Sequence, residues 1–304
     1  MTEPTVSVVI ATRDRPELLR RAVAGVMAQD LARPIECIVV LDGGTSVDLP
    51  AAPVDAAGAR TIVTMTNRRT PGLAGARNTG ADAATGAYLA FCDDDDAWLP
   101  RKLTAQLDAV EGSTAAVAVT GVRIEYQGAV TDRVPTVTVT HGDLLRSRAA
   151  SVHPSTILVR RDAFRDRIGP IDEAIPGSYG EDYEWLLRAT AAGPIVGVPE
   201  PLVTVRWGGS LFADRWEMMI QAIGYLIAKH PELVDDDANA ARLFGRIAFA
   251  NAALHRRGDA VRWSWRSLRR RPIERRPYLA LAVASGVVRA STVQRRANAV
   301  GRGV

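Results

Sequence analysis

The stretch AYLAFCDDDDAWLP, residues 87–100, places four consecutive aspartates directly after an apolar run. The run has the composition of a buried strand, and neighbouring carboxylates at its end repel one another unless something offsets their charge. Most charge runs are simply solvated. The sequence around the aspartates must therefore decide between a solvated loop and a binding site.

Continuous apolar runs alternate with helix-like segments through the first third of the chain. The strand-like runs are residues 6–11 (VSVVIA), 35–41 (IECIVVL), 61–64 and 88–92, and the helix-like segments are 17–29, 76–84 and 100–110. This alternation predicts an α/β fold with a mainly parallel sheet, in which ligands bind beyond the carboxyl ends of the strands. The loops TRDRP, DGGTS and DDDDAW follow three of these strands, and their convergence favours a binding site.

The rest of the chain predicts a mixed middle and a helical end. Residues 115–139 have the pattern of strands with a turn at Gln127-Gly128, residues 156–160 that of a further strand, and residues 181–192 that of an amphipathic helix. From about Leu211 onward the pattern is helical. Residues 246–272 resemble one tetratricopeptide-like hairpin with its turn at Gly258-Asp259, which we interpret as a helical cap.

Length and composition indicate an ordinary globular protein. The 304 residues are 47% hydrophobic and 24% charged. No basic and apolar leader pattern opens the chain, and the apolar run at residues 279–288 is too short to span a bilayer, so we expect a cytoplasmic protein. Cys37 and Cys92 lie in strand-like runs and are expected to be buried thiols. The four histidines show no zinc-type spacing with cysteine.

Charge is segregated along the chain. Residues 242–304 contain 15 arginines against Asp259 and Glu274, a net charge of +13, so the residues before them carry −9. A basic end on an acidic body suggests an anionic partner. Because Trp263 and Trp265 are expected to pack within the helical hairpin rather than stack on bases, we expect an anionic membrane surface at the cytoplasmic face rather than nucleic acid.

Clustered aspartates at a strand end also have a chemical use. Mg²⁺ and Mn²⁺ prefer oxygen ligands and are commonly held by one or two carboxylates together with substrate phosphates. Such a cation would offset the repulsion within the acidic loop and stabilise a departing diphosphate.

Four blocks of the sequence resemble the inverting family 2 glycosyltransferases of the GT-A fold, over about residues 6–210. The blocks are residues 6–29, 38–44 (IVVLDGG), 75–103 and 180–193 (GEDYEWLLRATAAG). The resemblance implies a central sheet flanked by helices, followed by a C-terminal helical extension. It also implies a division into a transferase domain over residues 1–210 and a basic helical region over 211–304. Within that domain, residues 1–100 would bind the nucleotide sugar and 101–210 the acceptor.

The resemblance also implies roles for individual residues. Asp182 falls on the catalytic base, which takes the proton of the acceptor hydroxyl, and the adjacent Glu181 would raise its proton affinity by repulsion. Asp95 falls on the metal ligand, with Asp94 near the metal or the ribose, and Asp42 on the residue that bonds the nucleobase. The residues expected to bind the nucleotide sugar are Ala11, Thr12, Arg13, Asp42, Arg77, Asp94 and Arg206, and those expected on the acceptor side are Trp98, His153 and Glu181.

Ordinary structural roles exist for several of these residues. Asp182 also suits the N-terminus of a helix, Arg77 could pin a loop, Arg13 could be solvated, and Trp98 and His153 could be parts of the core. The chain also departs from the family pattern. Ala11 replaces a proline, Asp14 an asparagine and Leu41 the first of two aspartates, and Arg206-Trp207-Gly208 stands where many relatives have Arg-x-His.

The expected function is a metal-dependent, inverting transfer of a sugar to an acceptor hydroxyl, in the biosynthesis of a polysaccharide, glycolipid or glycosylated metabolite. Mn²⁺ or Mg²⁺ would be the cofactor, and the donor a nucleotide-diphosphate sugar, with UDP favoured over GDP or dTDP. Two alternatives remain open. A metal-dependent nucleotidyltransferase would normally have a glycine-rich phosphate loop, which ATRDRPE lacks. A non-catalytic sugar-nucleotide-binding scaffold would be indifferent to Asp182→Asn.

Overall fold

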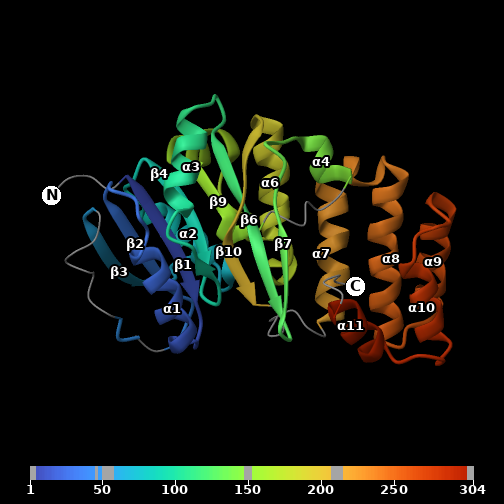
Figure 1. The fold of residues 1–304 in the computed structure, drawn as a ribbon. Coiled ribbons are helices and arrows are strands. Elements are labelled where there is room, and N and C mark those ends of the chain that lie inside the picture. Colours follow the sequence, from blue (N-terminus) through green and yellow to red (C-terminus); the bar gives the residue numbers. More distant parts are fainter. Residues whose placement is uncertain (1–4, 45–46, 50–57, 147–152, 207–214, 300–304) are drawn as a thin grey trace.

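The computed structural model describes residues 5–44, 47–49, 58–146, 153–206 and 215–299 (Figure 1). One sheet organises the described part of the chain, with the strand order β3-β2-β1-β4-β9-β6-β10-β5; β7 pairs with β6 and β8 with β10. The strands are β1 (Val6–Thr12), β2 (Ile35–Leu41), β3 (Arg60–Thr66), β4 (Tyr88–Asp93), β5 (Ala97–Trp98), β6 (Val117–Tyr126), β7 (Ala129–Arg133), β8 (Thr138–Val139), β9 (Ile157–Arg160) and β10 (Ile195–Arg206). The mixed α/β architecture expected from the sequence is confirmed.

The first four strands of the sheet are parallel, and their register determines where the site lies. Thr12 at the end of β1 pairs with Leu41 at the end of β2, and Ala11 pairs with Asp93 at the end of β4. The loops after these three strands therefore leave the sheet at the same edge, as the sequence predicts. Farther along, β9 is antiparallel to both β4 and β6, and β5 is antiparallel to β10, so parallel pairing does not extend across the whole sheet.

Helices cover both faces of the sheet. Along β1, Val6, Val8 and Ile10 face one core, shared with α1 (Pro16–Met27) and α3 (Lys102–Glu111). Val9 and Ala11 face the other core, shared with α2 (Leu73–Ala83) and α6 (Glu181–Ala192). Alternate residues of a strand point to opposite faces, so a strand covered on both sides must be apolar throughout.

Short helical turns connect these elements. They are α4 (His141–Arg146), η1 (Pro154–Thr156), α5 (Arg161–Ala163), η2 (Phe164–Ile168) and η3 (Pro176–Ser178). His153 precedes the turn η1, and β9 follows it directly. Because β9 pairs with β4, η1 lies beside β4. Cys37 and Cys92 are buried free thiols, as expected.

The C-terminal helices stack side by side at the end of the molecule opposite β1–β3 (Figure 1). They are α7 (Trp216–Lys229), the turn η4 (Pro231–Val234), α8 (Asp237–Ala253), α9 (Arg257–Arg270), α10 (Arg276–Ala284) and α11 (Ala290–Ala299). Apolar residues of α7 and α8, among them Ile223 and Ile247, belong to the same core as one face of the sheet. No described helix is both long and apolar enough to cross a membrane.

Two predicted boundaries are wrong. The turn between α8 and α9 lies at residues 254–256, where His255 has a φ of 61°, rather than at Gly258-Asp259. Both Gly258 and Asp259 lie in the first turn of α9, where an acidic side chain is stabilised by the helix dipole. Similarly, α3 begins at Lys102, two residues after Pro100. The predicted helix start at Leu211 lies outside the described residues, and the first described C-terminal helix begins at Trp216.

Candidate functional site

The acidic loop follows β4 and lies against the first loop of the chain. Asp94 is 7% exposed and accepts a hydrogen bond from the Thr12 hydroxyl (2.7 Å), and the Arg15 guanidinium lies 3.3 Å from Asp94 Oδ1 and 3.0 Å from Asp95 Oδ2. The Asp95 side chain keeps 42% of its surface exposed. Burial, followed by repulsion from Asp93, Asp96 and Asp94, raises the pKa of Asp95 to about 6. Asp95 is therefore the most exposed acid of this loop, and its ion pair with Arg15 only partly offsets the repulsion from its neighbours.

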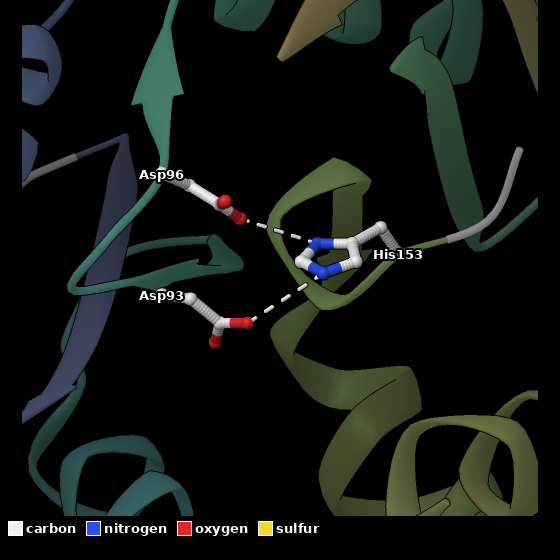
Figure 2. Close-up of side chains that lie close together, drawn as sticks. All are labelled: Asp93, Asp96 and His153. Carbon is white, nitrogen blue, oxygen red and sulfur yellow. Dashed lines mark ion pairs between the residues drawn. The ribbon is translucent and has the colours of Figure 1, made fainter. Parts of the chain in front are cut away.

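The other two acids of the loop converge on His153 (Figure 2). His153 Nδ1 lies 3.2 Å from Asp96 Oδ2, and its Nε2 lies 3.8 Å from Asp93 Oδ2. Burial lowers the pKa of His153, but the two carboxylates outweigh burial and raise it to about 9. Ser155 holds the loop from behind, because its hydroxyl donates to Asp96 and accepts from the backbone N–H of Asp93.

Asp93, Asp96 and His153 also form a group that could hold a metal ion. One donor atom from each lies within 4.8 Å of the others. Two carboxylates and an imidazole fit Mn²⁺, and carboxylates suit Mg²⁺. The two carboxylates that raise the pKa of His153 would also attract a cation placed between them. A divalent cation would replace that proton, since a ligating imidazole must be neutral.

A buried arginine connects the acidic loop to the predicted base helix. Arg77 on α2 is 2% exposed, and its two terminal nitrogens bind Asp93 and Glu181. Burial alone would lower the pKa of Arg77, but the two carboxylates hold it above its usual range. Burial likewise raises the pKa of Glu181, against the lowering effect of Arg77. With both nitrogens committed, Arg77 suits the role of pinning the site together better than direct contact with a diphosphate.

Asp182 lies at the start of α6, facing this network. Gly180 precedes the helix with a φ of 85°, a left-handed conformation that glycine adopts readily. The charge of Asp182 contributes to the raised pKa values of both Arg77 and His153, which places its carboxylate close to the acidic loop. The carboxylate of Asp182 therefore lies near the candidate metal group.

Asp42 at the end of β2 fastens a neighbouring loop. Its carboxylate accepts hydrogen bonds from the Asn67 side chain (2.8 Å) and from the backbone N–H of Gly72 (3.0 Å). Asn67 in turn binds Thr79 on α2. Asp42 thus lies at the expected edge of the sheet, where it orders the loop that leads into α2.

The remaining predicted residues lie in different surroundings. Ala11 is buried at the end of β1, and the Arg13 side chain is exposed. Trp98 is 4% exposed with Lys102 Nζ 3.6 Å from its ring centre, so it anchors the core beneath the acidic loop rather than offering an open acceptor platform. Arg206 pairs with Glu125 at 3.3 Å. Since β10 pairs Thr204 with Ala97, Arg206 lies two residues beyond the pairing with β5.

Sequence reasoning missed Arg15 and Ser155, and it assigned no individual role to Asp93 or Asp96. Arg15 stands two residues after Arg13 in the same loop, and only the loop conformation shows which arginine turns toward the aspartates. Ser155 is 59 residues from Asp96, and no local pattern connects them. Trp207-Gly208, the departure from the family's Arg-x-His, lies outside the described residues.

Comparisons with known proteins identify the family of the chain. The family model described as glycosyl transferase family 2 matches residues 7–168, more than half of the chain. The succinoglycan biosynthesis protein ExoO of Rhizobium meliloti (strain 1021) is 28% identical over 203 residues, which cover 62% of this chain and 57% of that protein. The UDP-Glc:alpha-D-GlcNAc-diphosphoundecaprenol beta-1,3-glucosyltransferase WfaP of Escherichia coli is 26% identical over 62% of this chain and 71% of that protein. The chain thus spans only about half the length of the first of these relatives.

Solved structures show the same fold at low identity. S. aureus TarS 1–349 in complex with UDP-GlcNAc superposes with a TM-score of 0.59 at 16% identity, over 98% of this chain and 92% of that one. The mannosyltransferase PcManGT from Pyrobaculum calidifontis, in complex with GDP-Man and Mn²⁺, superposes with a TM-score of 0.53 at 19% identity, over 98% and 81%. These similarities confirm the expected GT-A fold. Together with the matching family model, they show that the chain belongs to glycosyl transferase family 2.

Proposed function

We propose that this glycosyltransferase transfers a sugar from a nucleotide-diphosphate donor to an acceptor hydroxyl with inversion, in a single displacement that requires a divalent cation. The observation that carries the proposal is the pairing of an acidic loop, Asp93 to Asp96, with Asp182 across the buried Arg77 bridge. The carboxylates of the acidic loop are suited to bind a cation that contacts a diphosphate, and Asp182 is suited to accept a proton. These are the two tasks that the reaction requires.

In this scheme Asp182 accepts the proton of the acceptor hydroxyl while that oxygen attacks the anomeric carbon. The bond from the anomeric carbon to the diphosphate oxygen breaks on the opposite face, and its electron pair leaves with the nucleoside diphosphate. A cation held by Asp95 and by the group of Asp93, Asp96 and His153 would stabilise the negative charge of the leaving diphosphate. Arg77 keeps the two halves of the site in register.

The relatives suggest the class of substrate. Two Escherichia coli proteins similar to this chain, WfgD and WfaP, are named for transfer of glucose from UDP-Glc to a diphosphoundecaprenol-linked GlcNAc. We propose a lipid-linked saccharide acceptor for this chain as well, and a uridine diphosphate donor, with GDP or dTDP sugars as the alternatives to test.

A transfer assay with UDP-glucose, UDP-GlcNAc and GDP-mannose tests the proposal, with Mn²⁺, Mg²⁺ or EDTA present. We expect turnover of one donor that EDTA abolishes. Asp182→Asn should lower kcat at least a hundredfold while donor binding persists, because general-base catalysis contributes about 10²–10⁴-fold. Asp95→Ala should weaken both donor binding and turnover. Donor binding without any turnover, unchanged by Asp182→Asn, would instead identify a sugar-nucleotide-binding scaffold.

We further propose that α9 and α10 dock on an anionic membrane that carries the acceptor. Ser264 donates to the carbonyl of Pro277, and Ser267 donates to the carbonyl of Ala241 on α8. The residues that follow the first contact in the sequence are Trp265 on α9 and Tyr278 on α10. They are 63% and 52% exposed, so the expected packing of Trp265 within the hairpin is wrong, and they lie on a segment with a net charge of +13. Exposed aromatic and arginine side chains suit an anionic bilayer surface.

Vesicle co-sedimentation tests the docking face. We expect binding to vesicles that contain phosphatidylglycerol, loss of binding at high salt or with phosphatidylcholine alone, and clear weakening in Trp265→Ala with Tyr278→Ala. Val137→Ala, at another exposed apolar residue, is the control. Binding to nucleic acid without binding to vesicles would refute the membrane assignment.

A further inference from the structure

We infer that the C-terminal helices α7 and α8 hold the predicted base in position, with Arg246 as a positioning residue. The inference rests on the proposed role of Asp182. It extends the catalytic unit to helices that lie outside the segment matched by the family model, which ends at residue 168.

The first anchor lies three residues before Asp182. Arg246 on α8 donates a hydrogen bond to the hydroxyl of Tyr179, and its guanidinium lies 5.7 Å from the centre of the Tyr179 ring. A cation over an aromatic face and a charge-assisted hydrogen bond are both attractive, and both fix the orientation of the pair. Tyr179 is thus held from outside the sheet by a residue 67 positions away in sequence.

The second anchor lies two residues after Asp182. Glu184 has no exposed side-chain surface, and it binds Lys229 Nζ at 2.9 Å and His230 Nε2 at 3.0 Å, both at the end of α7. Arg188, which also lies on α6, is the third ion-pair partner of Glu184. Burial would raise the pKa of Glu184, but Arg188, Lys229 and His230 lower it overall. A buried carboxylate with three partners fixes α6 firmly against α7, because removing a partner would leave an uncompensated charge.

The backbone around the first anchor would not hold its shape alone. Gly177, Ser178 and Gly180 have φ values of 61°, 55° and 85°. A left-handed conformation is costly for serine, so the surrounding contacts must maintain it. Met218 on α7 fills the space beside Gly177, where an added Cβ would lie 1.9 Å from its Sδ.

Residues on both sides of Asp182 are therefore each tied to a different helix. Tyr179 is tied to α8, Glu181 to Arg77 on α2, and Glu184 to α7. Loss of the α8 contact should let the turn before α6 relax and misplace the carboxylate. A displacement of about 1 Å can cost a catalytic site about a hundredfold in rate.

Kinetics of Arg246→Met, Arg246→Lys and Tyr179→Phe test the inference. We expect Arg246→Met and Tyr179→Phe each to lower kcat at least tenfold, with the KM for the donor unchanged. The double variant should lower kcat no further than either single variant. Arg246→Lys keeps a cation over the ring and should retain most of the activity. The matched control is Arg33→Met, which removes an exposed pair with Glu111 (2.6 Å) and should leave kcat unchanged.

Amide hydrogen exchange over residues 176–186 gives a second readout that needs no turnover. Arg246→Met should increase exchange there, and Arg33→Met should not. If Arg246→Met lowers only the melting temperature, with kcat and local exchange unchanged, the positioning role is refuted. If the wild-type protein transfers no sugar while the exchange result holds, the proposed function fails but the anchoring of this turn stands.

Discussion

Lys102 offers a quantitative test of the structure beneath the acidic loop. Its ammonium is fully buried, lies 3.6 Å from the centre of the Trp98 ring and donates to Gln106 Oε1 at 2.7 Å. Burial lowers the pKa of Lys102 to about 7. An unfolded lysine titrates near ~10.4, so between these values the unfolded chain binds one proton more than the folded protein. The stability of the protein should therefore rise with pH through this window.

The magnitude follows from the two pKa values. A gap of about 3 pKa units at about 1.4 kcal/mol per unit corresponds to a cost on the order of 4 kcal/mol at neutral pH, which fades as the pH approaches ~10. Lys102→Met removes this pH-dependent cost. The variant leaves Gln106 Oε1 without its donor, at a cost of about 1–3 kcal/mol that does not vary with pH.

Urea unfolding of both proteins from pH 7.5 to pH 9.5 measures the difference. Across this range, we expect the free energy of unfolding of the wild type to rise by about 2 kcal/mol more than that of the variant. The control is Lys229→Met, at the only other lysine in the chain. The contacts of Lys229 with Asp172 and Glu184 outweigh burial and raise its pKa, so its contribution is lost only above the range scanned. Parallel pH curves for wild type and Lys102→Met would refute the reasoning.

Two further substitutions test other parts of the structure. Arg77→Met should destabilise the protein by about 3–5 kcal/mol in urea unfolding, because the buried Glu181 loses its cation and Asp93 keeps only His153 among the described residues; a loss below about 1 kcal/mol would argue against the buried bridge. Arg60 donates to five backbone carbonyls that lie between Met27 and Ala59. Arg60→Met should cost several kcal/mol by the same assay, on the order of 1 kcal/mol per lost bond, and an unchanged midpoint would contradict this.

Local sequence predicted the features that depend on neighbours along the chain. Continuous apolar runs located β1, β2 and β4, and the loops after them meet at one edge, as parallel strands require. The turn at Gly258-Asp259 was placed wrongly because glycine followed by aspartate suits a turn and also the first turn of a helix. The choice between them depends on how α9 packs on α8, which the local sequence does not contain.

Pairings between distant residues could not be predicted in this way. His153 meets Asp96 across 57 positions, and Arg246 meets Tyr179 across 67. Each pair depends on the path of the sheet and of the C-terminal helices, and an isolated histidine or arginine carries no sign of its partner. The family resemblance directed attention to Asp182 and Asp95, whereas the structure added Arg15, Ser155 and the Arg77 bridge.

Thermal unfolding with nucleotides and metal tests the central claim most directly. The protein is melted with UDP, GDP or dTDP and their sugars, each with Mn²⁺, Mg²⁺ or EDTA. We expect one nucleotide to stabilise the protein only with metal, by about 2.7 kcal/mol at a hundredfold excess over its Kd. The shift should be lost in Asp95→Ala and kept in Asp182→Asn. Stabilisation that persists in EDTA, or no shift with any nucleotide, would contradict a metal-dependent donor site at the acidic loop.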